Sequence, residues 1–202
     1  SSAGEYRITV SVTEMQNSIS VESAVTVVCV NGSESSGYRA ASGASSAYSN
    51  RVYEYTPAPG QFINETNTGG FTGSESTREA AVEYASKRIA KQSYVSLGSF
   101  GGYIIVGFDH SIQNKGGYDF AIQGNAFDSS NEPGIVWVMQ DVNGNGLPDD
   151  EWYELRGSET GKPTTIQDYE VTYFRPASDG SHTYWIDNLG NTGWGGFNAY
   201  HT

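Results

Sequence analysis

The chain has 202 residues, a formal net charge of −12 and a pI near 4.5. This acidity excludes a nucleic-acid surface, because phosphates are bound by clustered Lys and Arg, and it disfavours anionic lipid surfaces. Glycine (25 residues) and tyrosine (14 residues) are abundant and charged residues make up only 17%, which is typical of strands joined by polar turns. The single cysteine, Cys29, lies in an apolar run, so we expect it to be buried and expect no disulfide-linked partner.

Two strands are predicted near the N-terminus. Residues 5–12 alternate polar and apolar side chains, and residues 24–30 form an apolar run typical of a buried strand. We assign residues 1–32 to an N-terminal hairpin or to the last strands of a preceding immunoglobulin-like domain. Residues 33–50 are rich in Ser, Gly and Ala, which predicts a linker or surface loop. A ligand-binding domain is then predicted over residues 51–202.

The predicted domain contains one helix. A strand over 51–55 ends at a proline-containing turn, and a helix over 80–92 follows Ser76 as N-cap, with Glu79 completing a capping box. From residue 94 onward the pattern is β, with predicted strands at 103–108, 118–123, 134–140, 152–156, 168–174 and 183–187. Strands at this spacing, without intervening helices, favour a mostly β fold, namely a β-sandwich or jelly roll with one short helix.

The clearest motif is the acidic segment DVNGNGLPDD at 141–150. Oxygen-bearing side chains at loop positions one, three and five, a glycine at six, a backbone carbonyl at seven and a carboxylate at nine form the pattern of a loop around a hard cation. The glycine supplies the positive φ of a sharp turn. An EF-hand would place Glu at position twelve, which is Trp152 here, so Asp150 or Glu151 would supply the missing oxygens. The predicted ligands of a structural Ca²⁺ are Asp141, Asn143, Asn145, Leu147, Asp149 and Asp150, and the alternative is a polar turn without metal.

Aromatic residues make up 13% of the chain. The faces of Trp and Tyr suit sugars and planar ligands, whereas packing in the core or at strand edges is the alternative for most of them. Glycines surround the aromatics of segment 193–200 and remove other packing partners, so Trp194 and Tyr200 are predicted to be exposed on a loop. The predicted ligand-binding residues are Trp194, Tyr200, Phe197 and Trp185.

Enzyme motifs are weak. The three histidines lack metal-ligand spacing, and no G-x-S-x-G nucleophile elbow is present. The consecutive residues Asp109, His110 and Ser111 have the side chains of a triad, but neighbours on a strand point to opposite faces. A glycan hydrolase needs two carboxylates across a cleft, and the candidates for them are Asp119, Asp128, Glu132 and Glu154. We therefore expect a non-catalytic binding protein, with a glycan hydrolase or an adhesive structural domain as alternatives.

Four segments are distinctive in sequence: VSLGSFGGYIIVGFDHSI at 95–112, GYDFAIQGNAF at 117–127, SNEPGIVWVMQD at 130–141 and WYELRGSE at 152–159. Together they resemble a family of cell-surface proteins of Gram-negative gut anaerobes, often lipoproteins that follow an immunoglobulin-like PKD domain. The resemblance covers residues 51–200, and residues 5–12 are similar to the closing strand of a PKD domain.

The resemblance implies a role in nutrient capture, because members of that family lie near TonB-dependent outer-membrane uptake systems for corrinoids or glycans. We accordingly expect a corrinoid (cobalamin-type) ligand first and a neutral glycan second, passed on to such a transporter. The expected location is the extracellular side of the outer membrane, with the signal peptide and lipid anchor outside this sequence. The resemblance names no catalytic residue.

Overall fold

The computed structural model describes residues 10–15, 18–19, 23–28, 38–60, 62–124, 128–129, 134–178 and 181–195, with side chains from residue 38 onward except Thr68. The fold is mostly β with one short α helix, which confirms the predicted class. The elements are β1 (Val10–Met15), β2 (Ser18–Ile19), β3 (Ser23–Val28), β4 (Arg51–Thr56), a 3₁₀ turn (Thr66–Thr68), α1 (Arg78–Ile89), β5 (Tyr103–Gly107), β6 (Gly134–Met139), β7 (Trp152–Glu154), β8 (Thr165–Tyr169), β9 (Val171–Phe174), β10 (Thr183–Asp187) and β11 (Thr192–Gly195).

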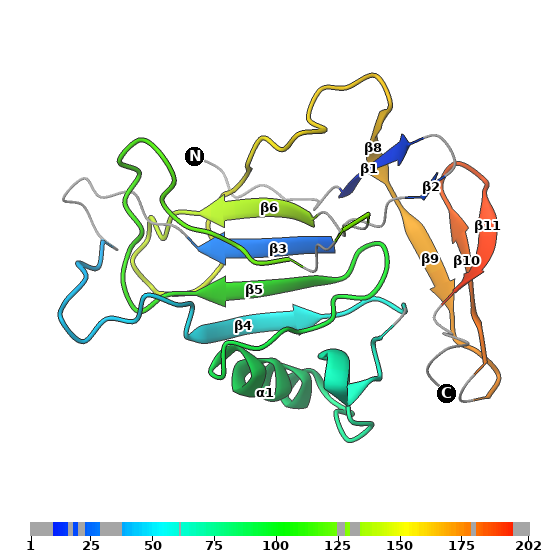
Figure 1. Ribbon diagram of the computed structural model, residues 1–202, viewed down its shortest axis with the longest axis horizontal. Helices are drawn as coiled ribbons and strands as arrows, with labels where there is room; N and C mark the ends of the chain where they lie inside the picture. The colour runs from blue at the N-terminus through cyan, green and yellow to red at the C-terminus, as the bar shows by residue number, and fades with distance from the viewer. Residues whose placement is uncertain are drawn as a thin grey trace.

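The largest sheet has five strands in the order β4-β5-β3-β6-β7 (Figure 1). Its central strand, β3, is parallel to β5 and β6, whereas the edge strands β4 and β7 are antiparallel to their neighbours. A continuous apolar run such as that of β3 suits a central parallel strand, because both faces of such a strand are covered. The sheet is therefore mixed, and the strand pairing does not confirm the predicted sandwich or jelly roll.

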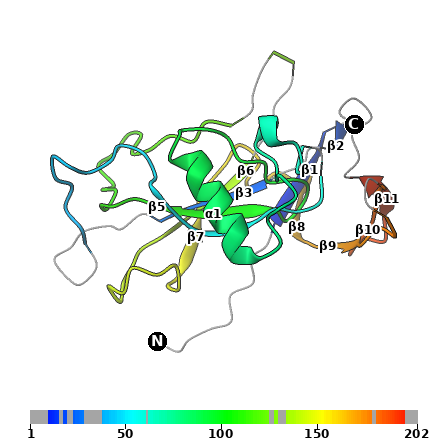
Figure 2. The same ribbon diagram turned by 90° about the horizontal axis from the view of Figure 1, so that it is seen from below.

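Helix α1 packs along β4 on one face of this sheet (Figures 1 and 2). Ala81 and Ala85 are buried there against a core that includes Tyr55 and Ile104. The predicted N-cap is wrong by one residue, because Thr77, with its extended backbone, accepts the hydrogen bond from Ala80 N at 3.1 Å. The helix also ends earlier than the predicted Gln92.

Two three-stranded sheets complete the fold, β2-β1-β8 and β11-β10-β9. In both views β9, β10 and β11 lie at one end of the molecule, to the side of the five-stranded sheet (Figures 1 and 2). The Tyr173 hydroxyl on β9 donates to the Phe100 carbonyl at 3.0 Å, and the ring of Phe100 packs edge-on against Tyr169. The first contact ties the sheet β11-β10-β9, called the small sheet below, to the segment that precedes β5, and the second ties β8 to the same segment.

The predicted division of the chain at 33–50 differs from the observed pairing. Strand β3 lies between β5 and β6, and β1 pairs with β8, so residues 10–28 share sheets with residues from the predicted ligand-binding domain. The physical reason is that an apolar strand needs hydrogen-bonding neighbours on both edges, and the later strands provide them. Residues 38–50 contain no helix or strand, as expected of a surface loop. Cys29, which is predicted to be buried, lies outside the described residues.

Two strand predictions are corrected. Residues 118–123 form no strand: Lys115 N donates to Asp119 Oδ1 at 3.2 Å, and Phe120 packs against the core without a backbone ladder. The predicted strand 168–174 is two strands, β8 and β9. The Asn188 side chain bonds to both sides of the break, donating to Asp168 O at 2.6 Å and accepting from Glu170 N at 3.2 Å.

No helix in the described part of the chain is long and apolar enough to cross a membrane.

Candidate functional site

Three aromatic side chains form a row across the small sheet β11-β10-β9. Tyr184 on β10 lies directly opposite Phe174 on β9 and Trp194 on β11, so the three rings share one face of the sheet. The ring centroids are 5.5 Å apart for Phe174 and Tyr184 and 4.9 Å apart for Tyr184 and Trp194. Phe174 is 47% exposed and Trp194 is 69% exposed. We call these three residues the aromatic row.

Among the described strand residues of β9, β10 and β11, those on the face that contains the aromatic row carry no formal charge. Because side chains alternate along a strand, the six that share this face are Thr172, Phe174, Tyr184, Ile186, Thr192 and Trp194. Trp194 is exposed as predicted, but it lies on strand β11 rather than on a loop. The face therefore offers aromatic rings and the hydroxyl groups of Thr172, Tyr184 and Thr192 to a neutral ligand.

The opposite face of the small sheet is used for packing. The ring of Trp185 covers Gly193 so closely that a Cβ there would lie 2.6 Å from Cζ2 of the indole. Burial raises the pKa of the Tyr173 hydroxyl on the same face. Trp185 is one of the predicted ligand-binding residues. It is half-buried on the face opposite to Trp194, because successive side chains of a strand point to opposite faces. The other two predicted residues, Phe197 and Tyr200, lie outside the described residues.

Asp187 holds the turn that joins β10 to β11. Its buried carboxylate accepts hydrogen bonds from Leu189 N at 3.0 Å, Asn191 N at 2.7 Å, Asn191 Nδ2 at 2.8 Å and the Tyr169 hydroxyl at 3.0 Å. Burial by itself raises the pKa of Asp187, but the hydrogen bonds from Asn191, Tyr169 and Leu189 outweigh burial and lower the pKa below its ordinary value. The turn is therefore rigidly braced, which keeps Trp194 in register with Tyr184.

The acidic loop 141–150 joins β6 to β7. Asp141 at its start is only 3% exposed. The Oδ2 atom of Asp141 accepts a hydrogen bond from Gly146 N at 3.0 Å, and Gly146 has φ 73°, the positive angle predicted for it. The Oδ1 atom of the same carboxylate is shielded from solvent and has no hydrogen-bond partner among the described residues. Such a bare carboxylate oxygen in a buried position is unfavourable unless a cation or donor faces it.

The other predicted ligands lie close together in this loop. Asn143 Oδ1 accepts from Asn145 N at 2.9 Å, and Asn145 Oδ1 accepts from Leu147 N at 2.7 Å. The amide groups of both asparagines donate to Asp149 Oδ1 at 3.2 Å. Among the described residues no group of three or more His, Cys, Asp or Glu side chains is arranged to hold a metal. The loop instead combines carboxylate with amide oxygens.

Hydrogen bonds also join this loop to the five-stranded sheet. Asp150 Oδ2 accepts from Val142 N at 2.9 Å and closes the base of the loop. The Tyr53 hydroxyl of β4 donates to the Gly146 carbonyl at 2.9 Å, and Asp150 N lies 3.3 Å from the sulfur of the buried Met139. The geometry of the loop is consequently linked to the packing around β6.

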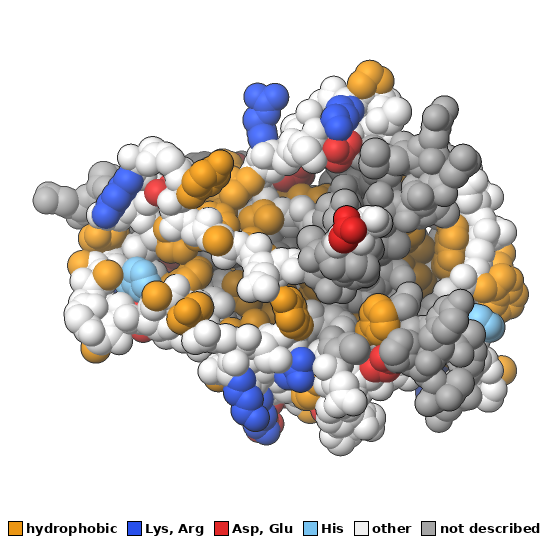
Figure 3. Space-filling model, in the orientation of Figure 1, with side chains coloured by type: hydrophobic (Ala, Val, Ile, Leu, Met, Phe, Trp, Pro, Cys, Tyr) orange, Lys and Arg blue, Asp and Glu red, His pale blue; other side chains and the backbone are white. Residues whose placement is uncertain are grey.

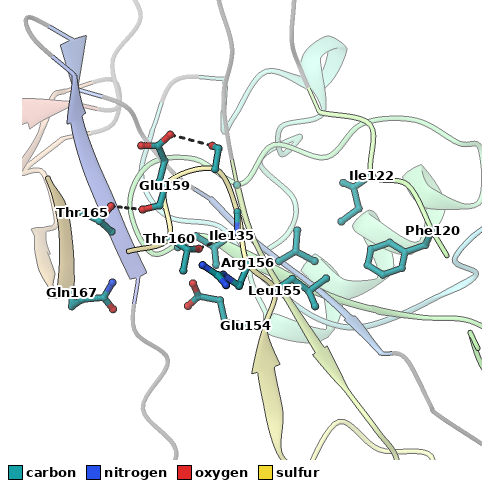
Figure 4. Close-up of a pocket in the computed structure, with 14 residues that line it drawn as sticks. Phe120, Ile122, Ile135, Glu154, Leu155, Arg156, Glu159, Thr160, Thr165 and Gln167 are labelled. Atoms are coloured by element: carbon teal, nitrogen blue, oxygen red, sulfur yellow. Dashed lines mark hydrogen bonds between the residues drawn. The ribbon is translucent and has the colours of Figure 1, made fainter. Parts of the chain in front are cut away.

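A trough lies along β6 and β7, bordered by segment 112–122. It consists of two hollows, of about 600 Å³ and about 340 Å³, which share Phe120 and Leu155 in their walls. Figure 4 shows the smaller hollow, with Phe120 and Ile122 on one side and Thr165 and Gln167 of β8 on the other. Hydrophobic side chains gather over the five-stranded sheet on the face seen in Figure 3. Such a concavity rimmed by polar groups suits a small ligand.

Two of the four predicted carboxylates line the trough, Asp119 in the larger hollow and Glu154 in the smaller one. Glu154 is open to solvent, yet partial burial of its carboxyl raises its pKa. A further carboxylate, Glu159, lines the smaller hollow and pairs with Lys162 at 2.7 Å. Asp128 lines neither hollow, and Glu132 lies outside the described residues.

Asp109 and Ser111 hold a loop through hydrogen bonds, and His110 Nδ1 lies 2.8 Å from Asp109 Oδ1. Asp109 Oδ2 accepts from Ser46 N at 3.1 Å and from Asn50 Nδ2 at 3.0 Å. The Ser111 side chain is buried and accepts from Arg39 N at 2.9 Å. These bonds fasten residues 38–50 to the end of β5.

Sequence reasoning missed Phe174 and Tyr184 as partners of Trp194, and it missed the trough. The alternation of residues 183–187 indicated which side chains share a face, but the neighbouring strands were needed to show which aromatics lie opposite Tyr184.

The chain matches no family model and no curated protein. The family resemblance of segments 95–159 stays a prediction.

Proposed function

We propose that this protein is a non-catalytic capture module of the cell surface, which binds an uncharged, ring-containing extracellular nutrient at the aromatic row. The observation that supports the proposal is the exposure of Phe174 and Trp194 beside Tyr184, on a face whose described strand residues are all uncharged. Packing does not account for this exposure, because the opposite face of the sheet provides the contacts with the rest of the molecule.

A neutral glycan is the ligand class that suits this face best. A sugar ring has an apolar C–H face that stacks on an aromatic ring, while its hydroxyl groups bond at the edge. Ring centroids about 5 Å apart, in line across three strands, can contact more than one sugar unit. Thr172 and Thr192 place hydroxyl groups beside the rings. The net charge of −12 further disfavours anionic ligands.

Binding should be measured with a panel of neutral glycans and with cyanocobalamin, the ligand that the family resemblance implies. We expect Trp194→Ala to weaken binding at least tenfold, a loss of about 1.4 kcal/mol. Tyr48→Ala is the matched control, because Tyr48 is a comparably exposed aromatic (57%) away from the small sheet. The proposal fails if no member of the panel binds, or if Trp194→Ala binds as tightly as the unaltered protein.

Delivery of the captured nutrient to a TonB-dependent outer-membrane transporter is part of the same proposal, and the family resemblance alone supports it. Site-specific cross-linking on intact cells would test it, with the cross-linker placed at exposed Leu189 in the turn next to the aromatic row. We expect an outer-membrane transporter among the adducts. Recovery of no such adduct in cells that are taking up the ligand would contradict delivery.

A glycan hydrolase is the second candidate function, and the raised pKa of Glu154 in the trough favours it. A general acid needs a raised pKa and a second carboxylate about 5–9 Å away. If the chain hydrolyses a bound glycan, Glu154→Gln should abolish release of reducing ends and leave binding at the aromatic row intact. Absence of any product from a bound glycan would leave capture as the function.

A further inference from the structure

The carboxylate of Asp141 is buried at the start of the acidic loop. Its Oδ2 reaches across the acidic loop to Gly146 N, so the carboxylate is turned into the loop and Oδ1 is enclosed with it. The residue is 3% exposed, and Oδ1 has no hydrogen-bond partner among the described residues. A buried anionic oxygen without a partner is strongly unfavourable, and a cation is the partner that compensates both the charge and the missing bond.

Oxygen-bearing side chains from the rest of the loop stand at the sequence positions that a cation loop requires. Each carbonyl oxygen of Asn143 and Asn145 accepts one backbone hydrogen bond and keeps a second lone pair for a metal. Asp149 lies beside both amide groups, and Asp150 closes the base of the loop. Asp141, Asp149 and Asp150 place three negative charges within this segment of the sequence.

We infer that the acidic loop binds Ca²⁺ through Asp141 Oδ1, the side-chain oxygens of Asn143, Asn145, Asp149 and Asp150, and the carbonyl of Leu147. Calcium is favoured over Mg²⁺ because it accepts six to eight oxygen ligands in flexible geometry, amide and backbone oxygens included, whereas Mg²⁺ demands a rigid octahedron and retains water. This loop is separate from the aromatic row on β9–β11. The calcium site and the proposed capture function can therefore fail independently.

The calcium ion has a defined structural consequence. Met139 and Gln140, which precede Asp141 directly, line the larger hollow of the trough. Tyr53 bonds the loop and packs beside Met139. The ion therefore braces the connection from β6 to β7 and the adjoining wall of the trough, while the small sheet stays unaffected.

The test compares Asp141→Asn with the unaltered chain, with and without calcium. In chelator, Asp141→Asn should melt at the same or a higher temperature, because it removes an uncompensated buried charge and keeps an oxygen for Gly146 N. In millimolar CaCl₂ the order should reverse, since only the unaltered chain gains stability from the ion. Glu83→Gln, which removes one exposed carboxylate on α1, is the control and should show no such reversal.

Calcium titration by calorimetry gives the second measurement. We expect saturable binding of one ion to the unaltered chain and at least tenfold weaker binding to Asp141→Asn. If Asp141→Asn does not fold, Asp149→Asn at the mouth of the loop should lower calcium affinity in the same direction. The inference is overturned if calcium changes neither melting nor heat, or if the variants bind as tightly as the unaltered chain.

Discussion

The aromatic side chains beneath α1 and those of the aromatic row on β9–β11 differ sharply in exposure. In the large sheet, Tyr55 is 2% exposed and packs against the ring of Phe71, with centroids 5.5 Å apart. In the small sheet, Phe174 and Trp194 leave about half or more of their surface in contact with solvent. A large aromatic group on an uncovered face gains little for folding, and this exposure is the observation on which the proposed capture function rests.

The largest effect should come from truncating the core of the large sheet. Ile104→Ala, at a position 3% exposed, should lower the free energy of unfolding by about 2–5 kcal/mol. Trp194→Ala should lower it by less than about 1 kcal/mol, because the side chain is already largely in water. Urea denaturation of both variants measures the contrast. Equal losses would mean that the aromatic row is a core in its own right.

A smaller effect is expected where the packing face of the small sheet is tight. Gly193→Ala places a Cβ against the Trp185 indole and should cost about 1–3 kcal/mol. Gly195→Ala on the same strand has no heavy atom within 4 Å of the new Cβ and is the matched control, expected to change stability by less than about 0.5 kcal/mol. Thermal melting separates the two, and similar melting temperatures would contradict the packing described for Trp185.

The turn of the small sheet should make stability depend on acid. The pKa of Asp187 is lowered in the folded state from its ordinary 3.8, so its contribution is present above that pH and is lost as pH falls through the folded pKa. At pH 7, Asp187→Asn should cost about 1.5 kcal/mol in hydrogen bonds to the charged group. The difference in the free energy of unfolding between Asp187→Asn and the unaltered chain should vanish below pH 3.8, once Asp187 is protonated in the folded state. Denaturation curves from pH 7 to 2 measure it, with Asp128→Asn, which replaces an exposed carboxylate, as the control substitution.

The smallest effect concerns the helix that covers the large sheet. Thr77→Ala removes the cap of α1 and should cost about 1 kcal/mol. Ser76→Ala, at the N-cap position expected from the sequence, should change the free energy of unfolding by a few tenths of a kcal/mol at most. If Ser76→Ala had the larger effect, the observed helix start would be incorrect.

Local patterns determined much of this protein without its tertiary structure. Alternation and apolar runs placed β4, β5, β6 and β10 within a residue or two, because burial of one or both faces imposes a period on the side chains. The positive φ at Gly146 followed from the spacing of the acidic loop. The exposure of Trp194 followed from its glycine neighbours. Each of these features depends on residues close together in the chain.

Only the tertiary structure decided which distant segments meet. The central place of β3, the alignment of Phe174 with Tyr184 and Trp194, and the trough between segment 112–122 and β6–β7 all depend on strand neighbours and register. The unpartnered oxygen of Asp141 likewise became visible only when its surroundings were known. The physical reason is that a side-chain pattern states which faces must be buried, whereas the identity of the covering element follows from pairing and packing across the whole chain.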